Sequence, residues 1–534
     1  MSTHRILARP PKGAARAPDR ITDSDRLLSV SEDAAHVRGH ASALVVPTTE
    51  AEIAAALRSS RTVLPIGAQS SLTGGATPDG DVVLSTAAFG RIIDVGTDRV
   101  MVEAGVSLAE LDAALTASGR YYPAGPTFSG AFVGGTVATN AAGAATFKYG
   151  STRRWVEAIT VVLPTGDVLE IERGRVHAHP NGYFEVCLDS GPVRVPVPNY
   201  AMPNVPKVSA GYFAAPGMDL VDLFIGAEGT LGVIVNVSLR VVSPRPAWCL
   251  AFVPFGVRNA AVSCVRRLRD AARETWRTKD PSGIDVSAIE HLDARCLELA
   301  REDGIDRKTG VTWPDGTATA LLITLELPPM ASALAYEQIS SASETARIDT
   351  PLGRFVRMLD AAGACGDILI AVPGDRARMA QFLALREQLP ASVNARIGRA
   401  KQTVDARIEK TAGDLIVPFE HIEEFLGCCD REFGRRRLDV AVWGHISDGN
   451  LHPNLLPRSF PDVEAGRMAI LELGRKVITL GGSPLAEHGV GRNRGKQRLL
   501  EELFGRQGVE EMRAVKRALD PEWKLAPGVL FPRT

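Results

Sequence analysis

The sequence lacks an excess of either charge. It has 61 Lys and Arg residues against 62 Asp and Glu residues, so the formal net charge is −1. Proteins that bind nucleic acid or anionic membranes usually carry a large basic excess, so the balance argues against both functions. No run of 18 apolar residues occurs either, and we therefore expect no transmembrane segment.

Paired cysteines are also absent. The seven cysteines are scattered and show no CxxC spacing, which argues against a disulfide framework or a zinc ribbon. We expect reduced, mostly buried thiols in a reducing compartment. The first 20 residues are rich in Arg, poor in acidic residues and without an apolar signal core. We interpret them as a solvated tail, with a transit peptide as the alternative.

Two common nucleotide-binding motifs are missing. Neither GxxxxGK[ST] nor a GxGxxG that opens a helix after a strand occurs, which argues against an NTPase and a nicotinamide Rossmann fold. Three other glycine-rich runs are present, at 65–75, 134–143 and 225–234. Glycine lets backbone N–H groups approach an anion closely, and Ser, Thr and Asn add neutral donors. Each run alone favours a simple turn, but together they are suited to one extended, phosphate-bearing cofactor.

The pattern of expected secondary structure changes near Pro244 and Pro246. From about 41 to 245, short β-rich runs alternate with glycine turns and a few helices, one of them capped at Thr49 with Glu52 three residues later. Candidate helices dominate afterwards, with strand-like runs between them. We expect helices at 257–276, 332–348, 374–389, 461–480 and 495–519, and strands at 319–327, 366–374 and 437–446.

This pattern predicts an α+β fold in two domains. The predicted divisions are a tail and lead-in at 1–40, a first domain at 41–245, and a second domain at 246–534 whose final part packs back on the first. A segment rich in Pro, Gly and aromatic residues, 173–213, is predicted to be an insertion. Functional and ornamental roles for it are both open.

The segment 437–457 predicts a β-hairpin with Asp448-Gly449 as its two-residue turn. That register would place His445 opposite His452, with their Cβ atoms about 4.5–5.5 Å apart. Two imidazoles in this arrangement are suited to hold one metal ion.

A third ligand is available in the glycine-flanked turn that contains Glu487 and His488. Two imidazoles and a carboxylate suit Zn²⁺ or a similar divalent ion. Spacing alone leaves metal binding and a pair of ordinary satisfied histidines equally open.

Four segments resemble, in order, the signatures of the vanillyl-alcohol-oxidase type of FAD-binding fold: PIGAQSSLTGG, VEAGVSLAELDAAL, PTFSGAFVGGTVATNAAGAATFKYGSTRRWV and DLFIGAEGTLGVI. The resemblance implies a two-lobed FAD-binding domain of the PCMH type, followed by an α+β cap domain of the FAD-linked oxidase C-terminal type. The first loop contains no His or Cys, so we expect FAD to bind non-covalently. The implied FAD contacts are Gly67, Ala68, Gln69, Ser70, Ser71, Leu72, Thr73, Pro126, Thr127, Gly134, Gly135, Thr139, Asn140, Gly143, Tyr149, Gly150, Glu228, Gly229, Gly232, Val233, Ile234 and Asn450.

The second half is similar to FAD-linked 2-hydroxyacid dehydrogenases and oxidases, the family of glycolate oxidase, D-lactate dehydrogenase and D-2-hydroxyglutarate dehydrogenase. GHISDGNLHPN resembles their GHxGDGNLH element, AEHGVG their EHGxG element, and LDPEWKLAPG their closing LDPxxxLNPG. The resemblance implies a divalent metal, expected to be Zn²⁺, on His445, His452 and Glu487. It also implies His488 as the base and Arg386 as the partner of the substrate carboxylate, with a solvated helix charge as the alternative for Arg386.

Several positions depart from that pattern. Ser447 replaces a glycine, and Ala526 and Val529 replace the Asn and Lys of LNPGK. Lys410 stands four residues before Asp414, where the family has a lysine two residues before. The substrate of the relatives is therefore not carried over to this chain.

The function expected from the resemblance is oxidation of a small 2-hydroxy acid, D-configured, to the 2-oxo acid. Hydride passes to the flavin with help from the metal, and electrons then go to an external quinone, cytochrome or electron-transfer flavoprotein. The alternatives are an FAD enzyme without net oxidation, as in alkyl-glycerone-phosphate synthesis, a non-catalytic flavoprotein component of a larger complex, and a metal-dependent hydrolase. We expect the cytoplasm, the periphery of the inner membrane, or the mitochondrial matrix in a eukaryote as the location. A homodimer is left open.

Overall fold

A computed structural model describes residues 3–14, 16–342 and 349–533. The chain divides into two compact units. Unit 1 comprises Met1–Gly143, Gly150–Pro244 and Leu485–Thr534, and unit 2 comprises Ala144–Tyr149 and Arg245–Pro484. Each unit therefore contains a piece of chain that lies far in sequence from the rest of that unit.

Unit 1 is built on three sheets. Parallel strands form the first in the order β2-β4-β3, antiparallel strands form the second in the order β5-β6-β11-β7-β8, and β1-β9-β10 form the third. Its strands are β1 (Arg5–Leu7), β2 (Ala43–Val45), β3 (Val63–Ile66), β4 (Val82–Ser85), β5 (Ile92–Val95), β6 (Arg99–Glu103), β7 (Val156–Val162), β8 (Val168–Glu172), β9 (Tyr183–Leu188), β10 (Gly191–Pro196) and β11 (Val233–Arg240). Its helices are α1 (Ser24–Leu28), α2 (Glu50–Ser59), α3 (Leu108–Ala117), α4 (Val133–Ala138), η1 (Thr152–Arg154), α6 (Leu220–Phe224) and α15 (Arg494–Leu519).

Local sequence signals explain where the helices of unit 1 begin. The Thr49 hydroxyl accepts the N–H of Glu52 at the start of α2, and the Glu52 carboxylate accepts the N–H of Thr48. Such reciprocal bonds satisfy donors that the first turn of a helix leaves unpaired. The cap expected at Thr49 is therefore present.

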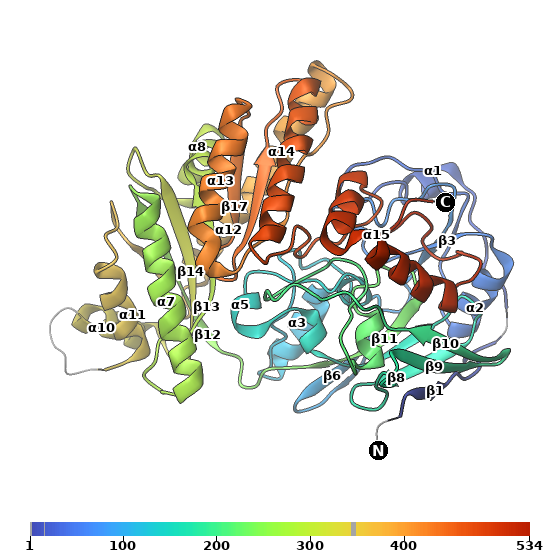
Figure 1. Cartoon of the computed structure of the whole chain (residues 1–534). Helices are drawn as coiled ribbons and strands as arrows, with labels where there is room; N and C mark the ends of the chain where they lie inside the picture. Colours follow the sequence, from blue (N-terminus) through green and yellow to red (C-terminus); the bar gives the residue numbers. More distant parts are fainter. Residues whose placement is uncertain (1–2, 15, 343–348, 534) are drawn as a thin grey trace. The chain divides into compact units, whose positions relative to one another are not determined.

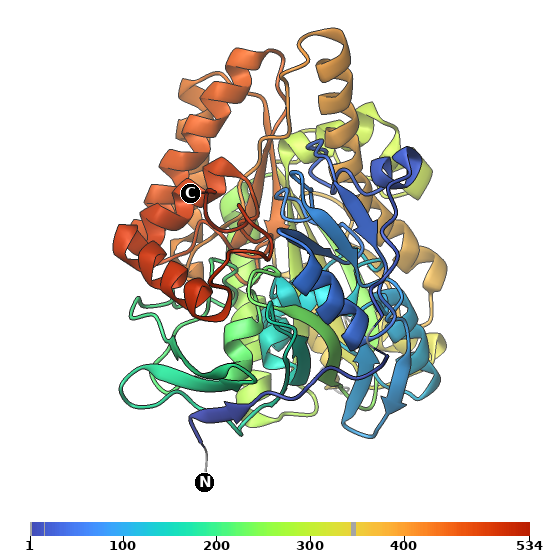
Figure 2. The same cartoon turned by 90° about the vertical axis from the view of Figure 1, so that its right-hand side faces the viewer.

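The segment 173–213 contributes a hairpin to unit 1. Strands β9 and β10 pair antiparallel, and β1 from the start of the chain adds to β9 in parallel. Figure 2 shows the N-terminal strand in dark blue beside this green hairpin. After the hairpin the segment runs through Lys207, whose side chain is fully buried.

The C-terminal segment belongs to unit 1. Helix α15 is broken at Gly505, whose φ of 70° and ψ of 170° are non-helical. Beyond the helix, Val63 of β3 donates its N–H to Lys524 O at 2.9 Å, and Ala526 donates to Val63 O at 2.8 Å. This pairing confirms the expectation that the tail returns to the first part of the chain.

Unit 2 is one antiparallel sheet with helices on both faces. The strand order is β15-β12-β14-β13-β17-β18-β16. Its strands are β12 (Ala247–Phe255), β13 (Val286–Asp293), β14 (Thr319–Leu327), β15 (Leu369–Ala371), β16 (Leu415–Ile416), β17 (Val440–His445) and β18 (Asn450–Leu455). Its helices are α5 (Thr146–Tyr149), α7 (Arg258–Thr278), α8 (Ala294–Glu302), α9 (Ile305–Thr309), α10 (Ser332–Ala342), α11 (Pro351–Asp360), α12 (Arg376–Thr403), η2 (Phe419–His421), α13 (Ile422–Arg435) and α14 (Phe460–Thr479).

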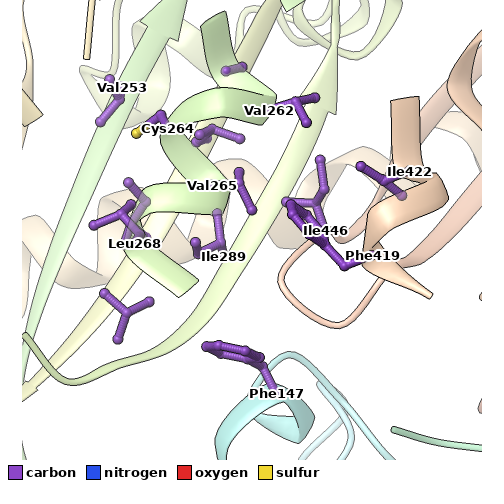
Figure 3. Packing of buried hydrophobic residues seen from close by; sticks show 14 of the residues in the cluster. Phe147, Val253, Val262, Cys264, Val265, Leu268, Ile289, Phe419, Ile422 and Ile446 are labelled. Carbon is purple, nitrogen blue, oxygen red and sulfur yellow. The ribbon is translucent and has the colours of Figure 1, made fainter. Parts of the chain in front are cut away.

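Alternation along the strands produces two cores. In β12, Cys249, Ala251 and Val253 join the core under α7, α11, α13 and α14, whereas Leu250 and Phe252 join the core under α8 and α12. Helix α7 runs along the sheet (Figure 1), and its Val262, Cys264, Val265 and Leu268 face Val253 and Ile289 of the strands (Figure 3). A sheet buried on both faces gives its strands the near-continuous apolar sequence seen in β14.

The short helix α5 belongs to unit 2 although its neighbours in sequence belong to unit 1. Phe147 packs in the α7 core (Figure 3), and the Lys148 ammonium lies 2.6 Å from both Asp285 and Glu326. Local sequence does not predict this exchange, because the motif that contains α5 resembles the FAD-binding half.

Most of the expected elements after residue 245 are present as α7, α12, α14, α15, β14, β15 and β17. The predicted helix at 332–348 begins as α10, and its residues 343–348 lie outside the described residues. His291 lies in β13. Within the described part of the chain, no helix has the length and apolar character that a membrane span requires.

The hairpin register differs from the predicted one. His445 pairs with Asn450, and Trp443 pairs with His452. The turn spans residues 446–449, because Asp448 N–H bonds to His445 O and Gly449 N–H bonds to Ile446 O. The Asp448 carboxylate also accepts the Asn450 N–H at 3.0 Å. These bonds close a four-residue loop in place of the two-residue turn.

Gly449 should be essential to this hairpin. Its φ is 88°, and a Cβ atom there would lie 2.1 Å from Val417 O. We expect Gly449→Ala to lower the free energy of unfolding by about 2 kcal/mol or more. Gly434→Ala, in α13 with no atom within 4 Å of the new Cβ, is the matched control and should raise stability by about 0.4–1 kcal/mol. Thermal denaturation that ranks the two variants equally would contradict this account.

Candidate functional site

The three glycine-rich runs meet in unit 1. The first follows β3, the second forms α4 and the third leads into β11. Gly226 donates its N–H to Val137 O at 3.0 Å, and Glu228 donates to Ala138 O at 2.7 Å. A Cβ atom on Gly229 would lie 3.5 Å from Pro65, at the start of the first run. The third run therefore lies against both of the other runs, although all three are far apart in the sequence.

Packing explains several of these glycines without a ligand. A Cβ atom would lie 2.6 Å from Ala104 at Gly134, 2.7 Å from Gly125 O at Gly143, and 2.3 Å from Val161 at Gly232. Only glycine tolerates such approaches. Gly135 differs, because no atom lies within 4 Å of its Cβ position. Open space at Gly135, in a cradle of small residues, fits an extended cofactor.

Some predicted FAD contacts hold the loops together through their side chains. Gln69 donates to Val30 O and Ala76 O, and Asn140 donates to Val208 O while it accepts the Arg153 N–H. Gln69, Asn140 and Glu228 all have positive φ, near 50°. Their side chains stabilise a backbone conformation that is uncommon for residues other than glycine.

The other predicted contacts of this group are spread over the same unit. Ser71 and Thr73 bring their hydroxyl oxygens to 3.0 Å. Thr139 is the C-cap residue of α4, and Gly150 has a φ of 75°. The remaining members are Gly67, Ala68, Ser70 and Leu72 in the first run, Pro126 and Thr127 between α3 and α4, and Val233 and Ile234 at the start of β11. Tyr149 and Asn450 are the exceptions, because both lie in unit 2. The Tyr149 hydroxyl donates to Glu326 at 2.5 Å.

The turn that contains Glu487 and His488 is anchored inside unit 1. The Glu228 carboxylate accepts the N–H groups of Val490 and Gly491, each at 2.8 Å. Burial raises the pKa of Glu228 to about 7, even though these two hydrogen bonds favour the ionised form. The carboxylate therefore connects the third glycine run to the residues that closely follow His488.

Glu487 faces a buried cation. Lys207 Nζ lies 2.8 Å from Glu487 Oε2, with the Lys207 side chain 0% exposed and the Glu487 side chain 8% exposed. His488 Nε2 lies 3.4 Å from Glu487 Oε1, and the imidazole is 28% exposed. The insertion thus brings a charged residue to the predicted metal and base residues of unit 1.

In unit 2, His445 and His452 share one face of the hairpin as diagonal neighbours. Their ring centroids are 5.5 Å apart at an interplanar angle of 85°, and both side chains are buried. His452 Nδ1 lies 3.6 Å from Asp414. The observed register differs from the predicted one by two residues. Because successive side chains alternate between the two faces of a strand, a shift of two residues leaves both imidazoles on the same face, and the structure brings them together.

Asn450 is completely buried in the same hairpin. Its amide donates to Asp414 at 3.2 Å and to Leu415 O at 3.1 Å. Among the described residues, the Asn450 Oδ1 atom has no hydrogen-bond partner. A buried acceptor without a protein donor is uncommon, and it fits a position that a bound group completes.

Arg386 is buried in α12 and is not a solvated charge. Its Nε lies 3.3 Å from Glu290 Oε1, and the same oxygen lies 3.1 Å from His445 Nδ1. Burial alone would raise the pKa of Glu290, but the nearby Arg386 guanidinium and the contact with the His445 imidazole outweigh burial and hold this pKa well below its usual range. Glu290 is therefore an anion between two predicted site residues.

Sequence reasoning missed three residues that lie against the predicted ones: Glu290, Lys207 and Asp414. Glu290 had a usable signal, since it is the one acidic residue inside the apolar run VSAIE of β13. Lys207 had none, because it lies in an irregular segment without periodicity.

Comparisons with known families agree with this architecture. A model of the FAD binding domain matches residues 41–172, so the chain carries that domain. A model described as FAD linked oxidases, C-terminal domain, matches residues 256–530, more than half of the chain. The protein therefore belongs to the family of FAD-linked oxidases.

Curated relatives are similar over nearly the whole chain. Glycolate oxidase subunit GlcD of Bacillus subtilis is 25% identical over 88% of this chain and 84% of its own length. D-lactate dehydrogenase of Anaerostipes hadrus is 25% identical, with 96% and 94% covered. Mitochondrial D-2-hydroxyglutarate dehydrogenase of Bos taurus is 29% identical, with 96% and 81% covered.

One solved structure shares the fold. An alkyldihydroxyacetonephosphate synthase superposes with a TM-score of 0.61 at 14% identity, covering 99% of this chain and 88% of that one. At this identity the likeness concerns the fold alone.

The Lys207–Glu487 pair should be important for stability. Lys207→Met removes the ammonium and leaves a buried carboxylate beside an apolar side chain, which we expect to cost about 3–5 kcal/mol. Lys12→Met is the control, because the Lys12 side chain is 71% exposed and its loss should cost no more than about 1 kcal/mol. The thermal midpoints of both variants measure the difference. Equal midpoints would show that Lys207 is not a stabilising partner.

His291 should make the protein sensitive to mild acid. It is fully buried, and burial together with the charge of Arg258 lowers its pKa to about 4. The unfolded chain, with an ordinary histidine pKa near 6.5, takes up the proton first. Stability is therefore complete above about pH 6.5 and falls toward pH 4, by about 2 kcal/mol at pH 5.

His291→Gln has no imidazole to protonate and should lose about 2 kcal/mol less than the parent protein between pH 7 and pH 5. Urea denaturation at the two pH values measures this difference. An equal loss in both proteins would contradict the assignment to His291.

Proposed function

We propose that this protein binds FAD non-covalently and oxidises a small 2-hydroxy acid, D-configured, to the 2-oxo acid. The relatives named as D-lactate and D-2-hydroxyglutarate dehydrogenases support the substrate class. The observation that carries the proposal is the pair of buried imidazoles of His445 and His452, whose ring centroids are 5.5 Å apart. The first half of the same chain carries an FAD-binding domain.

The FAD site is assigned to the three glycine runs and their neighbours. Gly67 to Thr73, the α4 region from Gly134 to Gly143, and Glu228 to Ile234 would hold the cofactor, with Pro126, Thr127, Tyr149, Gly150 and Asn450 as further contacts. Backbone N–H groups next to glycine suit a pyrophosphate. When bound, FAD supplies the acceptor for the hydride that leaves the substrate Cα.

The metal site is assigned to His445, His452 and Glu487, with Zn²⁺ as the expected ion. Neutral imidazoles and a carboxylate are the donor set that Zn²⁺ accepts, and they leave a position for substrate. When bound, the ion supplies positive charge beside the substrate hydroxyl, which lowers the hydroxyl pKa. The fit rests on the chemistry of the donors and on the proximity of the two imidazoles.

His488 and Arg386 have the roles of base and anchor. His488 accepts the hydroxyl proton of the substrate at a ring nitrogen, for which imidazole is suited near neutral pH. Arg386 pairs with the substrate carboxylate and orients the Cα–H bond, since guanidinium binds carboxylate through two parallel N–H groups. Orientation of the substrate Cα–H bond and removal of the substrate hydroxyl proton would together account for catalysis by the protein.

The proposal also covers the domain bounds, the electron acceptor and the location of the protein. The domains are taken as 41–245 for FAD and 246–534 for the substrate, after a lead-in at 1–40. The external acceptor is a quinone, a cytochrome or an electron-transfer flavoprotein. Action in the cytoplasm, or in the mitochondrial matrix of a eukaryote, is consistent with a mitochondrial relative.

The decisive experiment is anaerobic mixing of the purified protein with D- and L-forms of lactate and 2-hydroxyglutarate, and with glycolate. Loss of the oxidised flavin absorbance with at least one D-acid is the expected result. A colourless protein that takes up no added FAD would refute the proposal. So would an FAD-loaded protein whose spectrum no 2-hydroxy acid changes. Acid precipitation should release the flavin into solution, and flavin retained by the protein would refute non-covalent binding.

His488→Ala should slow anaerobic flavin reduction at least about 100-fold, the lower range of general-base contributions, while FAD content stays normal. His421→Ala is the control, because this histidine lies in η2 and pairs with Glu424 on the surface. Unchanged reduction in the His488 variant would overturn its assignment as the base. His452→Ala should lose metal and activity together.

A further inference from the structure

Glu290 occupies a position that no sequence motif assigns. It lies in β13, is 7% exposed, and is the direct cross-strand partner of His445 in β17. Cross-strand partners point to the same face of a sheet. Leu292 of β13 and Trp443 of β17 show that this face is the one covered by α8 and α12, and α12 carries Arg386.

One oxygen of Glu290 meets both predicted site residues. Glu290 Oε1 lies 3.1 Å from His445 Nδ1 and 3.3 Å from Arg386 Nε. All three side chains are at most one-tenth exposed, so water contributes little screening. Glu290 thus interacts with the imidazole and the guanidinium at once.

The contact with Glu290 determines which nitrogen atoms of His445 and Arg386 remain available for other partners. A carboxylate at Nδ1 favours the tautomer with a proton there, and Nε2 then keeps the lone pair that a metal needs. A guanidinium that meets a carboxylate through Nε retains two Nη groups for a second, bidentate partner. Both consequences suit the roles proposed for His445 and Arg386.

We propose that Glu290 is a positioning residue that fixes the His445 tautomer for metal binding and aims the Arg386 fork at the substrate carboxylate. This inference rests on the proposed function and adds to it the residue that links the metal ligand to the substrate anchor.

The competing explanation is that Glu290 serves only as a counter-ion to buried Arg386. A counter-ion stabilises the fold but has no effect on which imidazole nitrogen is available. Metal affinity separates the two explanations, because it is measured without turnover and depends on the Nε2 lone pair.

The experiment measures Zn²⁺ and Co²⁺ affinity of the FAD-loaded protein by competition with a chromophoric chelator. We expect Glu290→Gln to weaken binding about 10–100-fold, the usual cost of losing the partner of a ligating histidine. Glu326→Gln is the matched control, since Glu326 is a buried carboxylate of the same sheet paired with Lys148. Its metal affinity should stay within about threefold of the parent.

A second variant guards against loss of the fold. Glu290→Asp keeps the charge but shortens the side chain, and it should bind metal more tightly than Glu290→Gln and less tightly than the parent. At saturating metal, the glutamine variant should also show a raised KM for the 2-hydroxy acid, because Arg386 is no longer held. A counter-ion role alone predicts unchanged metal affinity in both Glu290 variants, so weakened binding that aspartate partly restores would not follow from it.

The outcomes are distinguishable. Equal metal affinity in the parent and in both Glu290 variants would overturn this inference and leave the proposed function intact. A parent protein that binds neither ion would overturn the metal part of the proposed function, and the inference with it. Equal weakening in the Glu290→Gln and Glu326→Gln variants would show a general effect of lost buried charge and would also overturn the inference.

Discussion

An ionised side chain that leaves water must meet an opposite charge, and this requirement determines the surroundings of the predicted site residues in each unit. In unit 2, Glu290 lies between Arg386 and His445. In unit 1, the fully buried Lys207 pairs with Glu487. Desolvating these groups singly would cost several kcal/mol each. Arg386, His445 and Glu487 are therefore each accompanied by a partner from an element outside their own motifs.

Backbone constraints complement the buried charges. Glycines 134, 143 and 232 allow close approach of neighbouring chain segments, and the carboxylate of Glu228 fastens the turn after His488. Gly449 closes the loop that joins the strands of His445 and His452. In each unit, backbone constraints of this kind hold the predicted site residues in place before a ligand binds.

The elements could be predicted from local sequence better than their partners could. Strong periodicity and capping predict α2, α7 and α14, and the motifs indicate the family. The predicted register of the β17–β18 hairpin is wrong, because the bond from the Asp448 carboxylate to Asn450 N–H enlarges the turn. Residue type alone does not distinguish that arrangement from a two-residue turn.

The remaining differences between the sequence predictions and the structure arise from tertiary contacts. From the sequence, Arg386 is equally compatible with a solvated charge on the protein surface. Only its packing in the structure shows that it is buried. Lys207 comes from an irregular segment, and α5 joins unit 2 although its motif belongs with the FAD-binding half. Such exchanges depend on contacts between residues far apart in sequence, which local patterns do not encode.

The central proposal is that His445, His452 and Glu487 bind one divalent ion. Anomalous diffraction from crystals of the zinc-loaded holoprotein, collected above and below the zinc edge, tests it most directly. The account predicts one strong anomalous peak within bonding distance, about 2.0–2.2 Å, of both imidazoles and the carboxylate. A fully occupied zinc bound elsewhere, or no peak at these three residues, would contradict it.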